Sequence, residues 1–281
     1  MNSNPQDGTS VKKYGLALHT ASRELGLAIS NFAGDSRCQT WNLDRDLATH
    51  LHQYLVEFIG PQTWADLAFI AVAKGPGGFT GTRMGMVTAR TLAQQLDIPV
   101  FAVSTLAAVA WAAPPQPPLG KGGLLNMEPP RDFVGAVPPC PPPPTDDFMG
   151  ISGIGATTGG LPLQENEPAQ SQPPLAKGGL LRDDIAVQMP AQRGQLFGAV
   201  YSVNKDSGVT ELFTDTVMTP ESWQEKLDNW GNSYQLIEVG SELGSSVSSV
   251  LELAYLEWKQ GSRPDWSDAL PFYGQHPVKG H

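Results

Sequence analysis

The chain has 281 residues, which is enough for one large domain or two small domains with a real hydrophobic core. Its formal net charge is −10 and it shows no basic patch or stripe, which argues against a protein that grips nucleic acid by itself. Residues 1–10 are polar and lack the apolar core of a signal peptide, and no apolar stretch is long enough to span a membrane. The two cysteines, Cys38 and Cys140, have no metal-binding or redox spacing. We therefore expect a cytoplasmic protein with reduced thiols and no membrane contact.

The first part of the chain alternates apolar strands with helices. After a loose tail over residues 1–12, the patterns predict three strands, then a helix, a strand, a helix, a strand and a helix. The strands are expected at 14–20, 25–30, 37–41, 67–73 and 98–103, and the helices at 44–59, 80–96 and 104–111. Ser104 is expected to cap the last of these helices. This order is typical of a mixed sheet with helices on its faces, which places the chain in the α/β class.

The composition changes between residues 113 and 184, which are crowded with proline and glycine. Residues 117–125 recur almost unchanged at 173–181, which indicates a duplicated or mobile element, and two copies are too few for a solenoid. Such a segment buries too little apolar surface to offset its ordering entropy. We expect a disordered insertion, with binding to a proline-recognising partner as the alternative. It divides the chain into an N-terminal lobe, 13–112, and a C-terminal lobe, 185–281.

Regular patterns return after the insertion. Strands are expected at 185–187, 195–203, 209–217 and 234–239, and a short extended tail at 270–275. One helix opens at Thr219, which caps it, and another covers 247–260.

A glycine-rich turn at residues 75–78 links strand 67–73 to the helix at 80–96. Thr80 is expected to cap this helix by accepting a backbone N–H of its first turn. The helix N-terminus could hold an anion. However, the turn lacks the spacing and the acidic residue of a dinucleotide site and the Gly-Lys-Ser/Thr of a phosphate loop. Nucleotide binding is therefore only weakly indicated.

The helix at 80–96 carries two charged residues, Arg83 and Arg90, so we expect most of its sides to be buried. Gly81, Gly85 and Ala89 recur every four residues and form a smooth ridge. A glycine in a helix interior costs about 1 kcal/mol relative to alanine, which the close approach of another helix backbone would offset. Two arrangements fit this pattern: the helix is sandwiched within its own domain, or one face packs on the sheet and the other on a second chain.

The search for catalytic groups finds no complete set. The patterns HExxH and HxxxH are absent, which argues against a zinc or iron site, and no serine lies in a nucleophile elbow. His19, at the end of the first strand, stands where a fold of this order places catalysis, although a lone histidine there is more often structural. Arg193 lies in a polar turn and either faces a ligand or a partner carboxylate or is simply solvated. We predict no catalytic, cofactor-binding or metal-binding residues.

The segment GPGGFTGTRMG at residues 75–85 closely resembles the GPGSFTGxRxG signature of the TsaB proteins. Residues 17–21, 103–106 and 271–273 resemble their first strand, their VSTL element and their late P-x-Y element. With the insertion set aside, the resemblance covers nearly all of the two lobes.

This resemblance implies a two-lobed actin-like ATPase fold built on ribonuclease-H-like halves. It also implies a non-catalytic subunit in the synthesis of threonylcarbamoyladenosine, next to the anticodon of tRNAs that read codons starting with A. The partners would be the catalytic paralogue TsaD, which carries an HxxxH metal site, and the ATPase TsaE. The chain would meet tRNA only through the complex and would hold no cofactor, and when alone it could pair with itself.

In the TsaB family the pairing surface includes the helix after the glycine signature. The resemblance therefore implies a partner interface on the helix at 80–96. The expected interface residues are Phe79, Thr80, Gly81, Arg83, Met84, Gly85, Val87, Thr88, Ala89 and Thr91.

The chain departs from the family pattern in several places. His19 stands where members usually have an aspartate, which in actin-like ATPases helps to organise the magnesium nucleotide; its loss argues against ATP hydrolysis. Gly78 replaces the serine of the signature, residues 190–197 lack the acids of the element DARxGEVY, and the insertion could crowd the pairing helix. The alternative is an enzyme of the same fold, either metalloprotease-like or nucleotide-hydrolysing, and the missing HxxxH argues against it.

Overall fold

The computed structural model describes residues 13–113, 183–240 and 242–274. All of them belong to one compact unit of the chain. The tail predicted over 1–12 lies outside the described residues, and so does the predicted insertion, apart from its first residue and its last two. The division into two lobes at the insertion therefore stays a prediction.

The first sheet has five strands in the order β3-β2-β1-β4-β5. The antiparallel strands β1, β2 and β3 come first in the chain, and β4 and β5 then add in parallel to β1. The strands are β1 (Tyr14–His19), β2 (Glu24–Ser30), β3 (Ser36–Asn42), β4 (Leu67–Ala73) and β5 (Val100–Val103). The mixed sheet predicted for this part of the chain is confirmed.

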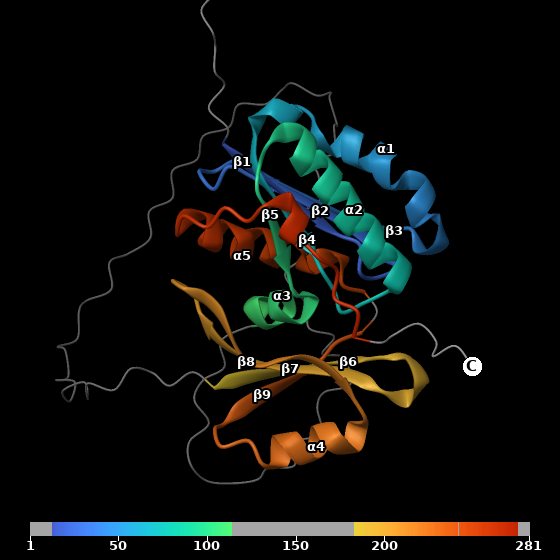
Figure 1. The fold of residues 1–281 in the computed structure, drawn as a ribbon, viewed down its shortest axis with the longest axis vertical. Coiled ribbons are helices and arrows are strands. Elements are labelled where there is room, and N and C mark those ends of the chain that lie inside the picture. The colour runs from blue at the N-terminus through green and yellow to red at the C-terminus, as the bar shows by residue number, and fades with distance from the viewer. Residues whose placement is uncertain (1–12, 114–182, 241, 275–281) are drawn as a thin grey trace, which may run out of the picture. The chain divides into compact units, whose positions relative to one another are not determined.

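Helices cover both faces of this sheet (Figure 1). Helices α1 (Leu47–Ile59) and α2 (Phe79–Leu96) lie on one face, and α5 (Val247–Lys259) lies on the other. Alternation along β1 explains the division, because successive side chains of a strand point to opposite faces. Leu16 and Leu18 join the core under α1 and α2, whereas Ala17 joins the core under α5.

The second sheet has four strands in the order β8-β7-β6-β9. They are β6 (Asp184–Pro190), β7 (Leu196–Asn204), β8 (Gly208–Met218) and β9 (Tyr234–Glu238). Helix α4 (Pro220–Asp228) packs on one face through Trp223, whose indole Nε1 donates to Gln188 Oε1 at 2.6 Å. Helix α3 (Thr105–Ala112) contacts the other face and also α5. The predicted class, two mixed sheets flanked by helices, is therefore confirmed.

Two of the predicted helix caps are present. Ser104 Oγ accepts hydrogen bonds from the backbone N–H groups of Leu106 and Ala107 at the start of α3. Thr219 Oγ1 accepts from Ser222 N at the start of α4, with a proline at the first helical position. Both side chains thus satisfy backbone N–H groups in the first turn of a helix, as the sequence patterns predicted.

A buried hydrogen-bond network joins the cap of α3 to the second sheet. Ser104 Oγ donates to Asp215 Oδ2 at 2.6 Å, and the hydroxyl of Tyr201 donates to Asp215 Oδ1. Tyr201 lies on β7 and Asp215 on β8, and all three side chains are buried. Burial raises the pKa of Asp215 and that of Tyr201, because a charge in this position is poorly solvated. The network therefore fixes the position of α3 on the sheet.

Replacing Tyr201 with phenylalanine is expected to lower the free energy of unfolding by about 2 kcal/mol, because a buried carboxyl oxygen of Asp215 loses its donor. Denaturant unfolding at neutral pH measures this change. The matched control is Tyr234→Phe, since the hydroxyl of half-buried Tyr234 has no hydrogen-bond partner among the described residues. Equal losses in the two variants would show that the network contributes nothing.

Cys38, in β3, is disulfide-bonded in the structure. The expectation of a reduced thiol is therefore wrong for this residue. Because disulfides are rare in reducing compartments, the cysteines no longer support the predicted cytoplasmic location.

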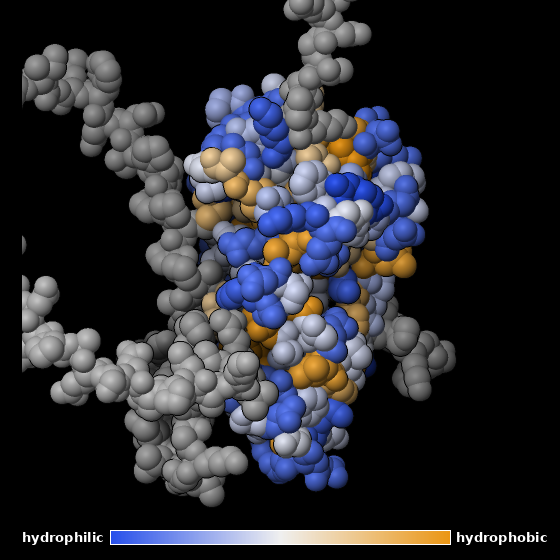
Figure 2. Space-filling view, turned by 90° about the vertical axis from the view of Figure 1, so that its left-hand side faces the viewer, coloured by the Kyte–Doolittle hydropathy of each residue, from blue (hydrophilic) through white to orange (hydrophobic). Residues whose placement is uncertain are grey.

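Among the described helices none combines the length and the apolar character needed to cross a membrane. The face seen in Figure 2 carries small apolar patches that hydrophilic side chains separate. Single exposed apolar residues of this kind are ordinary, so a docking surface must be identified by a contiguous hollow rather than by exposure alone.

Candidate docking surface

The glycine turn before α2 packs tightly against the end of β1. Gly78 N donates to Ala21 O at 2.6 Å, and a Cβ at Gly77 would overlap the same carbonyl oxygen. Helix α2 begins at Phe79, with Gly78 as its N-cap and no side-chain cap. The predicted cap at Thr80 is therefore wrong, because Thr80 already lies in the first turn of the helix. The glycines are required by the close approach of two backbone segments.

The small-residue ridge of α2 faces the interior of its own chain. A Cβ at Gly81 would overlap the carbonyl oxygen of Thr20, and a Cβ at Gly85 would overlap Thr20 Oγ1. Thr20 Oγ1 donates to Gly81 O at 2.8 Å, and Ala89 is completely buried. We expected the backbone of another helix to approach this ridge. The residue that does so is Thr20, at the end of β1. Gly85 and Ala89, although named as interface residues, do not reach the surface.

The opposite side of α2 faces outward. Val87 is 61 % exposed and Phe79 is 42 % exposed, which are high values for large apolar side chains. Thr80, Arg83 and Thr91 are also exposed. We call these five residues the outward face of α2. The helix thus packs on its sheet with one side and leaves the other open, as the second of the two expected arrangements requires.

An apolar groove of about 510 Å³ runs between α1 and the outward face of α2. Its α2 wall includes Met84 and Val87, and the buried side chain of Thr88 lies at it too. Its α1 wall includes Leu55 and Val56, and Val56 is 63 % exposed. Apolar side chains that line one contiguous groove are typical of protein–protein docking sites.

Sequence reasoning missed the α1 wall of this groove. Leu47, Leu51 and Leu55 recur at helical spacing along α1, and these residues are buried. Val56 lies outside that row, on the solvent side of the helix. The available signal was Val56 itself, an apolar residue that is out of register with the buried leucines.

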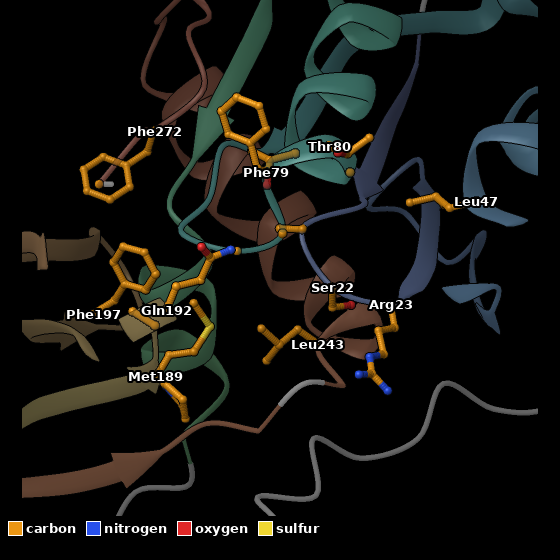
Figure 3. A pocket seen from close by; sticks show the side chains of 18 of the residues that line it. Ser22, Arg23, Leu47, Phe79, Thr80, Met189, Gln192, Phe197, Leu243 and Phe272 are labelled. Atoms are coloured by element: carbon orange, nitrogen blue, oxygen red, sulfur yellow. The ribbon is translucent and has the colours of Figure 1, made fainter. Parts of the chain in front are cut away.

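A larger hollow of about 1100 Å³ lies beside the N-terminus of α2 (Figure 3). Figure 3 shows Met189, Phe197 and Phe272 on one side of it and Leu47 and Arg23 on the other. The hollow therefore has a mixed lining, apolar from the second sheet and partly charged from the turn after β1.

Three arginines and one carboxylate belong to the lining of this hollow: Arg23, Arg45, Arg193 and Asp44. Arg23 Nε lies 3.8 Å from Asp44 Oδ1, and both side chains are well exposed, so this pair contributes little to stability. Arg193 has a positive φ of 60° and an exposed side chain. The structure thus brings Arg193 to a concave surface. Its contact with a ligand or a partner carboxylate stays a prediction.

His19 is completely buried at the end of β1, and neither of its ring nitrogens has a hydrogen-bond partner among the described residues. Desolvation lowers the pKa of His19 to about 4, so its imidazole is neutral at physiological pH. His19 does not line either hollow. The described part of the chain also brings no three His, Cys, Asp or Glu side chains together in a way that could hold a metal.

Comparison with known proteins identifies the relatives of this chain. The family model "TsaD: tRNA N6-adenosine threonylcarbamoyltransferase" matches residues 59–120. A Bacillus subtilis protein named tRNA threonylcarbamoyladenosine biosynthesis protein TsaB is 58 % identical over 45 residues, which are 16 % of this chain and 20 % of that protein. The chain is similar to TsaB over this stretch. A Buchnera aphidicola protein of the same name is 45 % identical over 51 residues, 18 % of this chain and 24 % of that protein.

The matches to both TsaB relatives span only about a fifth to a quarter of their length. Two solved structures from Pseudomonas aeruginosa extend the likeness at the level of the fold. YeaZ has a TM-score of 0.56 and 16 % identity, over 92 % of this chain and 100 % of that one. A protein described as having similarity to peptidase YEAZ has the same TM-score and identity, over 93 % and 99 %. The likeness shows that the chain has the fold of these two structures, as the resemblance to the family implies.

Proposed function

We propose that this TsaB relative is a non-catalytic subunit that pairs with a TsaD-like catalytic paralogue through the outward face of α2. The complex forms threonylcarbamoyladenosine next to the anticodon of tRNAs that read A-starting codons. The observation that carries the proposal is the apolar groove between α1 and α2, bordered by Val56 and Val87, which are both largely exposed in the single chain. Covering these side chains would remove apolar surface from water and so favour association.

Two features favour a non-catalytic role for this chain. His19, the residue on which the alternative of an enzyme rested, is buried away from both hollows. With a net charge of −10, the chain is poorly suited to hold tRNA alone, so we propose that tRNA is met only through the complex. The proposal includes a cytoplasmic location, cooperation with a TsaE-like ATPase and self-pairing through the same face when the partner is missing.

Replacing Val87 with glutamate is expected to weaken binding to the TsaD-like protein of the same cell by about tenfold or more, because the interface would lose an apolar side chain and a carboxylate would lose its hydration. Stability should change by less than about 0.5 kcal/mol, since Val87 is exposed in the single chain. Co-purification and titration calorimetry with the partner measure the effect.

The matched control is Leu212→Glu, on β8 of the second sheet, where leucine is 43 % exposed. It makes the same kind of change away from α2 and should leave binding intact. Normal pairing by the Val87 variant, or no pairing by the unchanged chain, would contradict the proposal.

A further inference from the structure

Both charged residues of α2 are held by aromatic rings. Arg83 Cζ lies 4.8 Å from the ring centroid of Phe79 and 5.6 Å from that of Tyr273. Arg90 Cζ lies 5.6 Å from the ring centroid of Trp266. Trp266 and Tyr273 belong to the C-terminal segment, which runs beside α2. Stacking on a ring holds a guanidinium in place and leaves its N–H edge available.

The N–H edges of these two arginines have no acceptor in the part of the chain that the structure describes. Neither Arg83 nor Arg90 forms a hydrogen bond or an ion pair there. Two other ring-stacked arginines behave differently. Arg37 donates to two backbone carbonyls at 2.8 and 2.9 Å, and Arg263 donates to two at 2.6 and 2.5 Å. The pair on α2 is therefore prepared for acceptors that the chain itself does not supply.

The two arginines lie along one edge of the outward face of α2. They are seven residues apart, which is about two helical turns or roughly 10 Å. Val87 lies between them and is exposed. Met84 and Leu92 line the apolar groove with α1, and Arg83 lines it too. The cationic edge of α2 thus borders the apolar side chains of the groove.

We infer that the outward face of α2 receives a helix of a partner protein that lays apolar side chains into the α1–α2 groove and presents two carboxylates, about two turns apart, to Arg83 and Arg90. This inference rests on the proposed function and adds the chemistry of the partner. A groove between two helices suits an amphipathic helix. A phosphate backbone is disfavoured, because the surface between the arginines is apolar and the chain carries a net charge of −10.

The test is the affinity for the TsaD-like partner at several salt concentrations. Arg83→Gln and Arg90→Gln are each expected to weaken binding about fivefold to tenfold at low salt, and the double variant should show a flatter salt dependence than the unchanged chain. Arg83→Lys keeps the charge but loses the planar stacked fork, so it should recover only part of the affinity. The matched control, Lys226→Gln on α4, removes the same charge and should bind normally.

The outcomes separate this inference from the proposed function. If the unchanged chain binds and the arginine variants bind equally well with the same salt dependence, the inference fails and the proposed function stands. If the unchanged chain does not bind, both fail. If the isolated chain shifts tRNA in a gel and the double variant does not, the arginines bind phosphates and the inference is overturned.

Discussion

Replacing Gly85 with alanine is expected to lower the free energy of unfolding by about 3 kcal/mol, the upper end of the usual cost of overpacking a core. The added Cβ would overlap Thr20 Oγ1 and would lie 3.2 Å from Thr20 Cβ and 3.3 Å from Thr20 Cγ2. Rotating the threonine gives incomplete relief, because Thr20 Cβ would stay 3.2 Å away and the bond from Thr20 Oγ1 to Gly81 O would be lost. The gain in helix propensity, about 1 kcal/mol, is too small to compensate.

Denaturant unfolding measures this loss, and two further variants locate its cause. Adding Thr20→Ala to Gly85→Ala removes the clashing oxygen and should restore part of the stability, although Thr20→Ala alone destabilises by losing a buried hydrogen bond. Gly231→Ala is the matched control, since a Cβ there meets nothing within 4 Å. An unchanged stability in Gly85→Ala would mean that α2 does not lie this close to β1.

This result also decides how the docking surface can be tested. The sequence pattern of Gly81, Gly85 and Ala89 correctly predicts that something approaches α2 closely, but it does not tell what. The neighbour is Thr20, which is 61 residues from Gly81 in the sequence, so no local pattern reveals it. A bulky residue at Gly85 would disturb folding and pairing together, whereas Val87 on the outward face separates the two.

Local signals predicted the elements well because each strand and helix follows its own period. Leu16 and Leu18 alternate with Ala17 along β1, and the caps at Ser104 and Thr219 form as expected. Thr80 failed as a cap because the chain gives that place to Gly78, where the backbone meets the carbonyl of another turn.

Long-range relations stayed out of reach of the sequence. The network of Ser104, Tyr201 and Asp215 joins residues 97 and 111 positions apart. The ring partners of Arg83 and Arg90 likewise come from a C-terminal segment far along the chain. A hint existed in α2 itself, which has two arginines and no acidic residue to pair with them. The sequence alone does not show where the guanidinium groups of the two arginines lie, and the stacking geometry locates them.

Lowering the pH from 8 to 5 is expected to cost about 2 kcal/mol of stability through His19 alone. The pKa of His19 is lowered from 6.5 to about 4 in the folded chain, because burial disfavours the charged imidazole. Below pH 6.5, His19 therefore binds a proton in the unfolded chain, whereas in the folded chain it binds one only near pH 4. Stability is full above the unfolded pKa and falls as the pH drops through this window, to a total loss of about 3 kcal/mol.

The test compares the pH dependence of unfolding between the unchanged chain and His19→Leu, with His19→Gln as a second uncharged replacement if leucine packs badly. Burial raises the pKa values of Asp215 and Glu257, and those shifts favour the folded chain as the pH falls. Both chains contain these two groups, so the difference between their curves isolates the effect of His19. The difference in stability between the unchanged chain and the variant should change by about 3 kcal/mol between pH 7 and pH 4. Parallel curves would mean that His19 is solvated or partnered in the folded protein. His19 would then again be a candidate for the catalytic role that its burial argues against.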